Sequence, residues 1–323
     1  MHELTIRPYR PGDEVAINQG FNRAFGLHRS LEEWIWKYPA EPEGRWIMLA
    51  CGRGGALLAH YGAVPVRLRV GAVTVRAGQI SDQFSVPEGR QGLGAASTYI
   101  KTVNTFYSEF GAPQALAVLY GFPGERALRL GLARLGYGQM QPQPIAVWHR
   151  PAGRRGRLWT GHTVRAGFDP RSVDALWRMA GGRYRIGVQR DAAWLARRFT
   201  NRPGVEYVHL IAHAHRRPAA LAVLRATKAT VQWCELVWDG ISSRALAALD
   251  RVAASIARRL GAGGLEMWLG GDPVAEAELA DLGWVRGPHP DRLMMVARSF
   301  HPEIDVASFS GQFYLTMGDA DLV

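Results

Sequence analysis

The chain has 323 residues, 47% of them hydrophobic and 10% aromatic, which is enough for two domains that each bury a full core. Its formal net charge is +11, but the basic residues are scattered and no nucleic-acid-binding motif accompanies them, so we expect no nucleic-acid partner. An anionic small molecule or an acidic protein partner suits this charge better. No apolar stretch reaches the roughly 18–20 residues of a membrane span.

The two cysteines, Cys51 and Cys234, lie in apolar, strand-like runs without a paired pattern. Such cysteines are typical of buried thiols in a reducing compartment. The chain begins with the pattern of a strand and not with that of a signal peptide. We therefore expect a cytoplasmic location.

Segment 79–95 carries the most informative pattern in the first half of the chain. An alternating apolar run ends at Pro87, a glycine-rich turn follows at 89–94, and a helical pattern then continues to about Glu109. Strand, glycine turn and helix in this order can hold a pyrophosphate. The amides at a helix N-terminus have no intrahelical partner, and glycine lets the backbone approach a phosphate closely.

The common phosphate-binding loops fit this turn poorly. A Walker A loop needs Lys and then Ser or Thr after its last glycine, and a Rossmann turn needs a third glycine and a later acidic residue. The turn offers only a G-x-G, from Gly92 to Gly94. It resembles motif A of the GNAT superfamily of acyl-CoA N-acyltransferases, V-x-P-x-x-(Q/R)-x-x-G-x-(G/A). Arg90 or Gln91 supplies the polar start, although the spacing from Arg90 to Gly92 is one residue shorter than in the family pattern.

The next segments extend the resemblance. Residues 116–120 have the pattern of a buried strand, and a helical pattern from Arg126 ends in Leu135-Gly-Tyr137, an order that resembles motif B of the same superfamily. The patterns at 34–42 and 64–69 are similar to a tandem GNAT subfamily with members among bacterial acetyltransferases.

The resemblance implies a fold, a co-substrate and its binding residues. The fold is α/β, with two GNAT-like domains that are each a mixed, mainly antiparallel sheet flanked by helices. The co-substrate is acetyl-CoA or another acyl-CoA. The main chain of the strand would hold the acyl-pantetheine arm, through Phe84, Ser85 and Val86. The turn would hold the pyrophosphate, through Gln91, Gly92, Leu93, Gly94, Ala95 and Ala96.

The chain also repeats itself at about half its length. Lys37-Tyr38-x3-Pro42-x3-Trp46 is echoed 161 residues later by Arg198-Phe199-x3-Pro203-x3-Tyr207. The second copy has no glycine turn, so we expect it to line the acceptor pocket and to bind no CoA. The expected division is a GNAT domain at 1–150, a linker at 151–165, a degenerate GNAT-like domain at 166–300 and a C-terminal tail at 301–323.

Direct acyl transfer from a thioester to an amine needs a proton acceptor and, for the thiolate, a proton donor. Asp82 on the predicted strand is the first candidate for the base, and Glu88 is the second. Many GNATs have a tyrosine four residues before the motif B glycine as the acid. Leu132 stands there in this chain, so Tyr120 is the candidate acid, or none is needed. Glu125 is a candidate for orienting the acceptor, or it simply favours the start of its helix.

No metal site is expected. His209, His213 and His215 fall on a predicted strand and its turn, without a cysteine or carboxylate beside them, and a solvated strand edge explains them better.

By resemblance, the function is N-acyl transfer, most simply of acetyl, to a primary amine of a small molecule or sugar. Two alternatives stay open. The first is a longer acyl chain or an acyl carrier protein as donor, in natural-product or polysaccharide assembly. The second is a non-catalytic module that binds acyl-CoA. The excess of basic over acidic residues favours a neutral or anionic acceptor.

Overall fold

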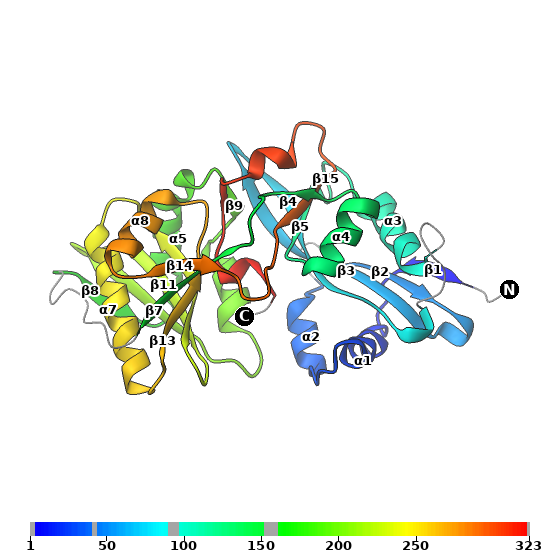
Figure 1. Cartoon of the computed structure of the whole chain (residues 1–323), viewed down its shortest axis with the longest axis horizontal. Helices are drawn as coiled ribbons and strands as arrows, with labels where there is room; N and C mark the ends of the chain where they lie inside the picture. The colour runs from blue at the N-terminus through cyan, green and yellow to red at the C-terminus, as the bar shows by residue number, and fades with distance from the viewer. Residues whose placement is uncertain (1–3, 41–43, 90–96, 152–160, 322–323) are drawn as a thin grey trace. The chain divides into compact units, whose positions relative to one another are not determined.

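The computed structural model describes residues 4–40, 44–89, 97–151 and 161–321, which fold into two compact units (Figure 1). Unit 1 consists of residues 1–68, 74–142 and 294–308, and unit 2 consists of residues 69–73, 143–293 and 309–323. No helix in the described part of the chain is long and apolar enough to cross a membrane.

Unit 1 is built on a mixed sheet with the strand order β1-β2-β3-β4-β5-β15-β6. β4 and β5 pair in parallel. The pairs β1–β2, β2–β3, β15–β5 and β15–β6 are antiparallel. The strands are β1 (Thr5–Pro8), β2 (Trp46–Cys51), β3 (Leu57–Val70), β4 (Val73–Ser85), β5 (Val118–Gly121), β6 (Gly138–Gln139) and β15 (Val296–Ser299).

Helices cover both faces of this sheet. α1 (Glu14–Phe25) and α2 (Leu31–Lys37) pack on one face, and α3 (Thr98–Phe110) and α4 (Glu125–Arg134) pack on the other (Figure 1). Every residue of β2 is buried, because successive side chains enter the two cores in turn. Met48 joins the core under α3, whereas Ile47 joins the core under α1 and α2.

Unit 2 repeats this plan. Its sheet has the order β14-β7-β13-β12-β11-β10-β8, and here too one inner pair, β12 and β13, is parallel. The elements are β7 (Ala146–Pro151), β8 (Thr163–Ala166), α5 (Pro170–Ala180), β9 (Ile186–Val188), α6 (Ala192–Leu195), β10 (Val208–Ala214), β11 (Arg217–Ala226), β12 (Val231–Trp238), α7 (Ser243–Arg259), β13 (Gly264–Trp268), α8 (Pro273–Asp281), β14 (Val285–Pro288) and β16 (Phe313–Tyr314).

The units depart from the expected domain boundaries because the two halves of the chain exchange a strand. β7 follows the first copy in sequence but pairs with β13 and β14 of the second sheet. β15 follows the second copy but lies between β5 and β6 of the first sheet. Residues 143–151 therefore belong to unit 2 and residues 294–308 to unit 1. The sequence did not predict this exchange, because the apolar pattern of a buried strand is the same whichever sheet it joins.

Candidate functional site

The parallel strands β4 and β5 pair over a short stretch only. Their ladder joins Ala77 to Val118 and Gln79 to Tyr120, and within these two described strands it ends there. Beyond Gln79, β4 continues to Ser85 without β5 as its ladder partner. A strand that continues beyond its ladder partner is a common place for an extended ligand to bind.

A bulge at Asp82 marks the point where β4 diverges. Asp82 has φ +53, a left-handed conformation that is rare for residues other than glycine. Ile80 enters the core under α3, and Gln83 accepts a hydrogen bond from Tyr99 of α3 (2.9 Å). Asp82 and Phe84 instead meet groups of α1 and α2. The bulge thus changes which side chains of β4 face α1 and α2.

Two cations hold the Asp82 carboxylate. Arg29, in the connection between α1 and α2, donates from Nη1 to Oδ2 at 2.5 Å, and Lys37, at the end of α2, donates from Nζ to Oδ1 at 2.6 Å. The three side chains are only 6%, 10% and 1% exposed for Arg29, Lys37 and Asp82. Two adjacent positive charges stabilise the ionised carboxylate, which favours a positioning role over proton acceptance.

His60 of β3 completes what we call the Asp82 cluster, which is Arg29, Lys37, His60 and Asp82. Its Nδ1 lies 2.6 Å from the main-chain oxygen of Asp82, so Nδ1 carries the proton and donates it to that carbonyl. The ring stacks on Phe84, with centroids 5.2 Å apart and an interplanar angle of 9°. Burial lowers the pKa of His60 to about 4, so the ring is neutral at pH 7.

Three buried polar atoms near the divergence of β4 have no hydrogen-bond partner within the described segments. They are Nη2 of Arg29, Nε2 of His60 and Nε2 of Gln79. Buried polar atoms in native proteins are usually satisfied, and exceptions gather where a ligand or water binds. The face of β4 that carries the Asp82 cluster is therefore the strongest candidate for a ligand site in unit 1.

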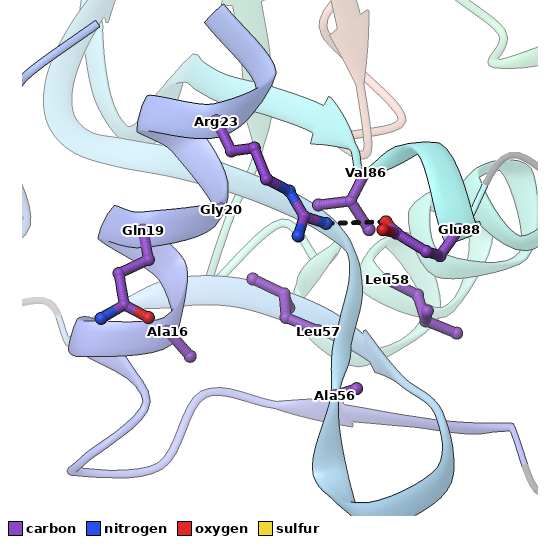
Figure 2. Close-up of a pocket in the computed structure, with 9 residues that line it drawn as sticks. All are labelled: Ala16, Gln19, Gly20, Arg23, Ala56, Leu57, Leu58, Val86 and Glu88. Carbon is purple, nitrogen blue, oxygen red and sulfur yellow. Dashed lines mark hydrogen bonds and ion pairs between the residues drawn. The ribbon is translucent and has the colours of Figure 1, made fainter. Parts of the chain in front are cut away.

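A groove of about 530 Å³ lies close by, between α1, the start of β3 and the residues that follow β4 (Figure 2). Its walls are mainly apolar, and Arg23 of α1 reaches across it to Glu88 at 2.7 Å. The lining residues are Ala16, Gln19, Gly20, Arg23, Ala56, Leu57, Leu58, Val86 and Glu88. The groove adjoins Gly89, the last described residue before the predicted phosphate turn.

The structure brings together part of the predicted donor site. The expected strand and helix are present on either side of the predicted turn, with β4 ending at Ser85 and α3 beginning at Thr98. Phe84 packs its ring against Phe21 and Phe25 of α1, and Val86 lines the groove. The turn residues Gln91, Gly92, Leu93, Gly94, Ala95 and Ala96 lie outside the described residues, so their assignment stays a prediction.

The predicted catalytic residues fall in three different environments. Asp82 is buried in its cluster, and Tyr120 is buried in β5 as the ladder partner of Gln79. Glu125 begins α4 with its side chain 82% exposed and lies 3.7 Å from Arg129, so it is not brought together with the other two. Glu88, the second candidate base, is exposed and pairs with Arg23.

The amino-acid sequence alone did not point to Arg29 and left the role of His60 open. A lone arginine in a polar connection has no motif, and a histidine on a strand points to either face. The internal repeat could have pointed to Arg29. Arg29 lies 161 residues before Arg190, and Lys37 lies the same distance before Arg198.

Comparison with solved structures gives the fold. The chain matches a probable N-acyltransferase of Enterococcus faecalis V583 (15% identity, TM-score 0.69), covering 95% of this chain and 74% of that one. It matches a GCN5-related N-acetyltransferase of Kribbella flavida (15% identity, TM-score 0.68), covering 92% of this chain and 71% of that one. It matches a tandem GNAT protein from the clavulanic acid biosynthesis pathway (12% identity, TM-score 0.58), covering 94% of this chain and 100% of that one. No protein-family model matches the chain, and no curated protein matches it in sequence.

These likenesses confirm the expected fold class. The chain has the tandem GNAT fold, with two mainly antiparallel mixed sheets flanked by helices. Identities of 12–15% establish the fold and leave the activity to be argued from the site.

Proposed function

We propose that the protein is an acyltransferase that moves an acyl group, most simply acetyl, from acyl-CoA to a primary amine. The observation that carries this proposal is the divergence of β4 from β5 beyond Gln79, with unpartnered polar atoms gathered beside it. A strand that continues beyond its ladder partner suits the amide-rich pantetheine arm, which hydrogen-bonds as an added strand would. The predicted glycine turn follows directly and suits the pyrophosphate.

Acyl-CoA supplies an activated thioester. The acceptor nitrogen attacks the thioester carbonyl carbon, the C–N bond forms as the C–S bond breaks, and the amine loses a proton while the thiolate gains one. In this scheme the main chain of Phe84, Ser85 and Val86 holds the arm. Asp82 holds its two cations and, through its carbonyl, the ring of His60.

Two groups are candidates for the proton acceptor. Asp82 remains the sequence-based prediction, although both of its oxygens contact cations. His60 is neutral at pH 7 and its Nε2 has no partner within the described chain, so it has a lone pair to offer. Tyr120 remains the predicted acid, buried beside Gln79 at the end of the β4–β5 ladder.

The first test is calorimetric titration of the protein with acetyl-CoA, longer acyl-CoAs and free CoA at fixed salt. We expect saturable binding with one site per chain, because only the first copy has the glycine turn. Gly94→Trp should abolish this binding and leave the thermal unfolding midpoint unchanged, because the indole would fill the predicted phosphate turn. Unchanged affinity in this variant would refute the assigned donor site.

The same titration decides between the alternatives. The apolar groove beside Val86 favours a donor with a longer acyl chain as the second candidate function, and tighter binding of longer acyl-CoAs would support it. Binding of acyl-CoA without release of free thiol across a broad amine panel would point to a non-catalytic module. Thiol release with an acyl carrier protein alone would identify a carrier-protein donor.

A further inference from the structure

The two units place the same pair of cations at corresponding positions. Arg29 and Lys37 in unit 1 correspond to Arg190 and Arg198 in unit 2 at one offset of 161 residues. The local structure agrees, because Arg29 and Arg190 each directly precede the residue that caps a helix. That residue is Ser30 for α2 and Asp191 for α6.

The first cation of each pair forms an ion pair with an acidic residue on the corresponding strand. In unit 1 this residue is Asp82, which follows the last parallel pair of β4 and β5. In unit 2 it is Glu235, which follows the last parallel pair of β12 and β13, Trp233 with Met267. Nε of Arg190 donates to Oε1 of Glu235 at 3.0 Å, as Arg29 donates to Asp82.

In unit 2 a second carboxylate completes the site, and the chain's own C-terminal segment supplies it. Nη2 of Arg190 donates to Oδ2 of Asp319 at 2.5 Å, and both side chains are fully buried. Nε of Arg198 donates to the main-chain oxygen of Gly318 at 3.1 Å. Thr316 donates from Oγ1 to Glu235 at 3.0 Å.

This segment lies where the two parallel strands of unit 2 diverge. Leu315 exchanges backbone hydrogen bonds with Gly270, just beyond β13, at 3.0 and 3.3 Å. The hydroxyl of Tyr314 donates to the main-chain oxygen of Leu236 in β12 at 2.5 Å. The C-terminal segment therefore lies in unit 2 at the place that corresponds to the Asp82 cluster of β4 in unit 1.

Among the described residues of unit 1, Asp82 is the one carboxylate that contacts Arg29. The guanidinium of Arg29 also meets two neutral groups, namely Asn18, which accepts from Nε at 2.8 Å, and the ring of Phe21. Nη2 of Arg29, the atom that in Arg190 binds Asp319, is buried and has no partner among the residues described. Arg29 thus has one guanidinium donor that a ligand could bind.

We propose that Arg29 of unit 1 binds a carboxylate carried by the acceptor amine, in the place that Asp319 takes in unit 2. The acceptor would then belong to the class of amines that carry a carboxylate, such as amino acids or short peptides. This inference rests on the proposed acyl transfer for the amine, whereas the carboxylate site follows from the contacts alone. Residues 26–28, directly before Arg29, are exposed.

The test compares the common amino acids with their C-terminal amides, which differ only in the carboxylate. Binding of each to the full-length protein is followed by saturation-transfer NMR, without acyl-CoA. We expect the preferred amino acid to bind at least tenfold more tightly than its amide, since a charge-assisted hydrogen bond to a buried guanidinium is lost. Equal binding of acids and amides to the wild-type protein would overturn the proposal, with no variant needed.

Arg29→Lys keeps the positive charge beside Asp82 but removes Nη2, so the preference for acids should fall about tenfold or more. Arg7→Lys is the matched control, because Arg7 also forms an ion pair in unit 1, with Asp13 at 2.7 Å, outside the site. It should leave the preference intact. An Arg29→Lys protein that keeps the full preference would assign the carboxylate to other residues and overturn the proposal.

A second arm distinguishes the source of the carboxylate. If Arg29 recognised a carboxylate on the acyl group, Arg29→Lys would weaken succinyl-CoA binding about tenfold relative to acetyl-CoA, and the acceptor assignment would fail. We expect the ratio of the two affinities to stay unchanged. Failure of the wild-type protein to bind any acyl-CoA, together with a retained preference for acids, would refute the proposed acyl transfer and leave the carboxylate site standing.

Discussion

Asp82 combines an unusual backbone conformation with an unusual electrostatic environment. Its left-handed φ costs on the order of 1–3 kcal/mol in a residue other than glycine, and such a conformation persists only where the surrounding contacts impose it. The ion pairs with Arg29 and Lys37 and the hydrogen bond from His60 to its carbonyl supply those contacts. The residue thereby links α2, β3 and the point at which β4 diverges.

Replacing Asp82 tests whether it positions or accepts a proton. Asp82→Asn removes the charge that two buried cations contact, so we expect a loss of about 3–5 kcal/mol in the free energy of unfolding, measured by urea denaturation. The matched variant Asp13→Asn, at a half-buried ion pair of unit 1, should cost less. Unchanged stability together with a large loss of rate at neutral pH would instead support Asp82 as the base.

His60 makes stability depend on pH. Its folded-state pKa of about 4 lies below the ordinary value of 6.5, so the unfolded chain binds the proton more tightly. The contribution of neutral His60 to the free energy of unfolding is fully present above pH 6.5 and is lost as the pH falls through 4. At 1.36 kcal/mol per pKa unit it amounts to about 3 kcal/mol.

His60→Asn isolates this contribution, because an Asn side-chain amide can still donate to the Asp82 carbonyl but does not titrate. We expect the wild-type protein to lose more unfolding free energy than the variant between pH 7 and pH 4. Burial raises the pKa of Glu235 to about 7, so this residue changes the unfolding free energy with pH in the opposite direction. Both proteins contain Glu235, so its effect cancels when their stability curves are compared. Parallel stability curves for the two proteins would contradict the assignment.

At the scale of elements, β15 is the strand that the second half of the chain contributes to unit 1. Val296 is fully buried in the core under α3, and its strand pairs with both β5 and β6. A fragment of residues 1–142 would lack this strand and expose an unpaired edge of β5. We expect the fragment to show no cooperative unfolding transition in urea, followed by circular dichroism.

A matched fragment supplies the control. The N–H of Met140 donates to the main-chain oxygen of Met295 at 2.9 Å, so the chain after β6 and the chain before β15 run side by side. Joining residue 142 to residue 294 through a short glycine-rich turn should therefore restore a cooperative transition. A cooperative transition in the fragment that lacks β15 would show that the exchanged strand is dispensable.

The elements show what the sequence can and cannot predict. The order of β4, turn and α3 followed from apolar alternation and glycine placement, and the fold class followed with it. The strand exchange did not, because pairing partners distant in sequence leave no local pattern. The Asp82 cluster was predicted only through Asp82, since its cations come from a connection and a helix end that carry no motif.

At the scale of the molecule, the two sheets have the same strand order and their sites have diverged. The sequence of the first copy has the glycine pattern, and in the second copy the C-terminal segment lies at the corresponding place. The buried contacts among Arg190, Glu235 and Asp319 fix that segment in place. Under the proposed function, this difference predicts one acyl-CoA per chain.

The exchanged strand also sets the order of events when the chain is made. Residue 142 leaves the ribosome long before residue 299, the end of β15. At 5–20 residues per second the delay is roughly 8 to 30 seconds. During that time β5 has no neighbour on its outer side, and the core under α3 lacks Val296. The first half of the chain thus completes its sheet only when the second half has almost been synthesised, so nascent chains need protection from edge-to-edge pairing over that interval.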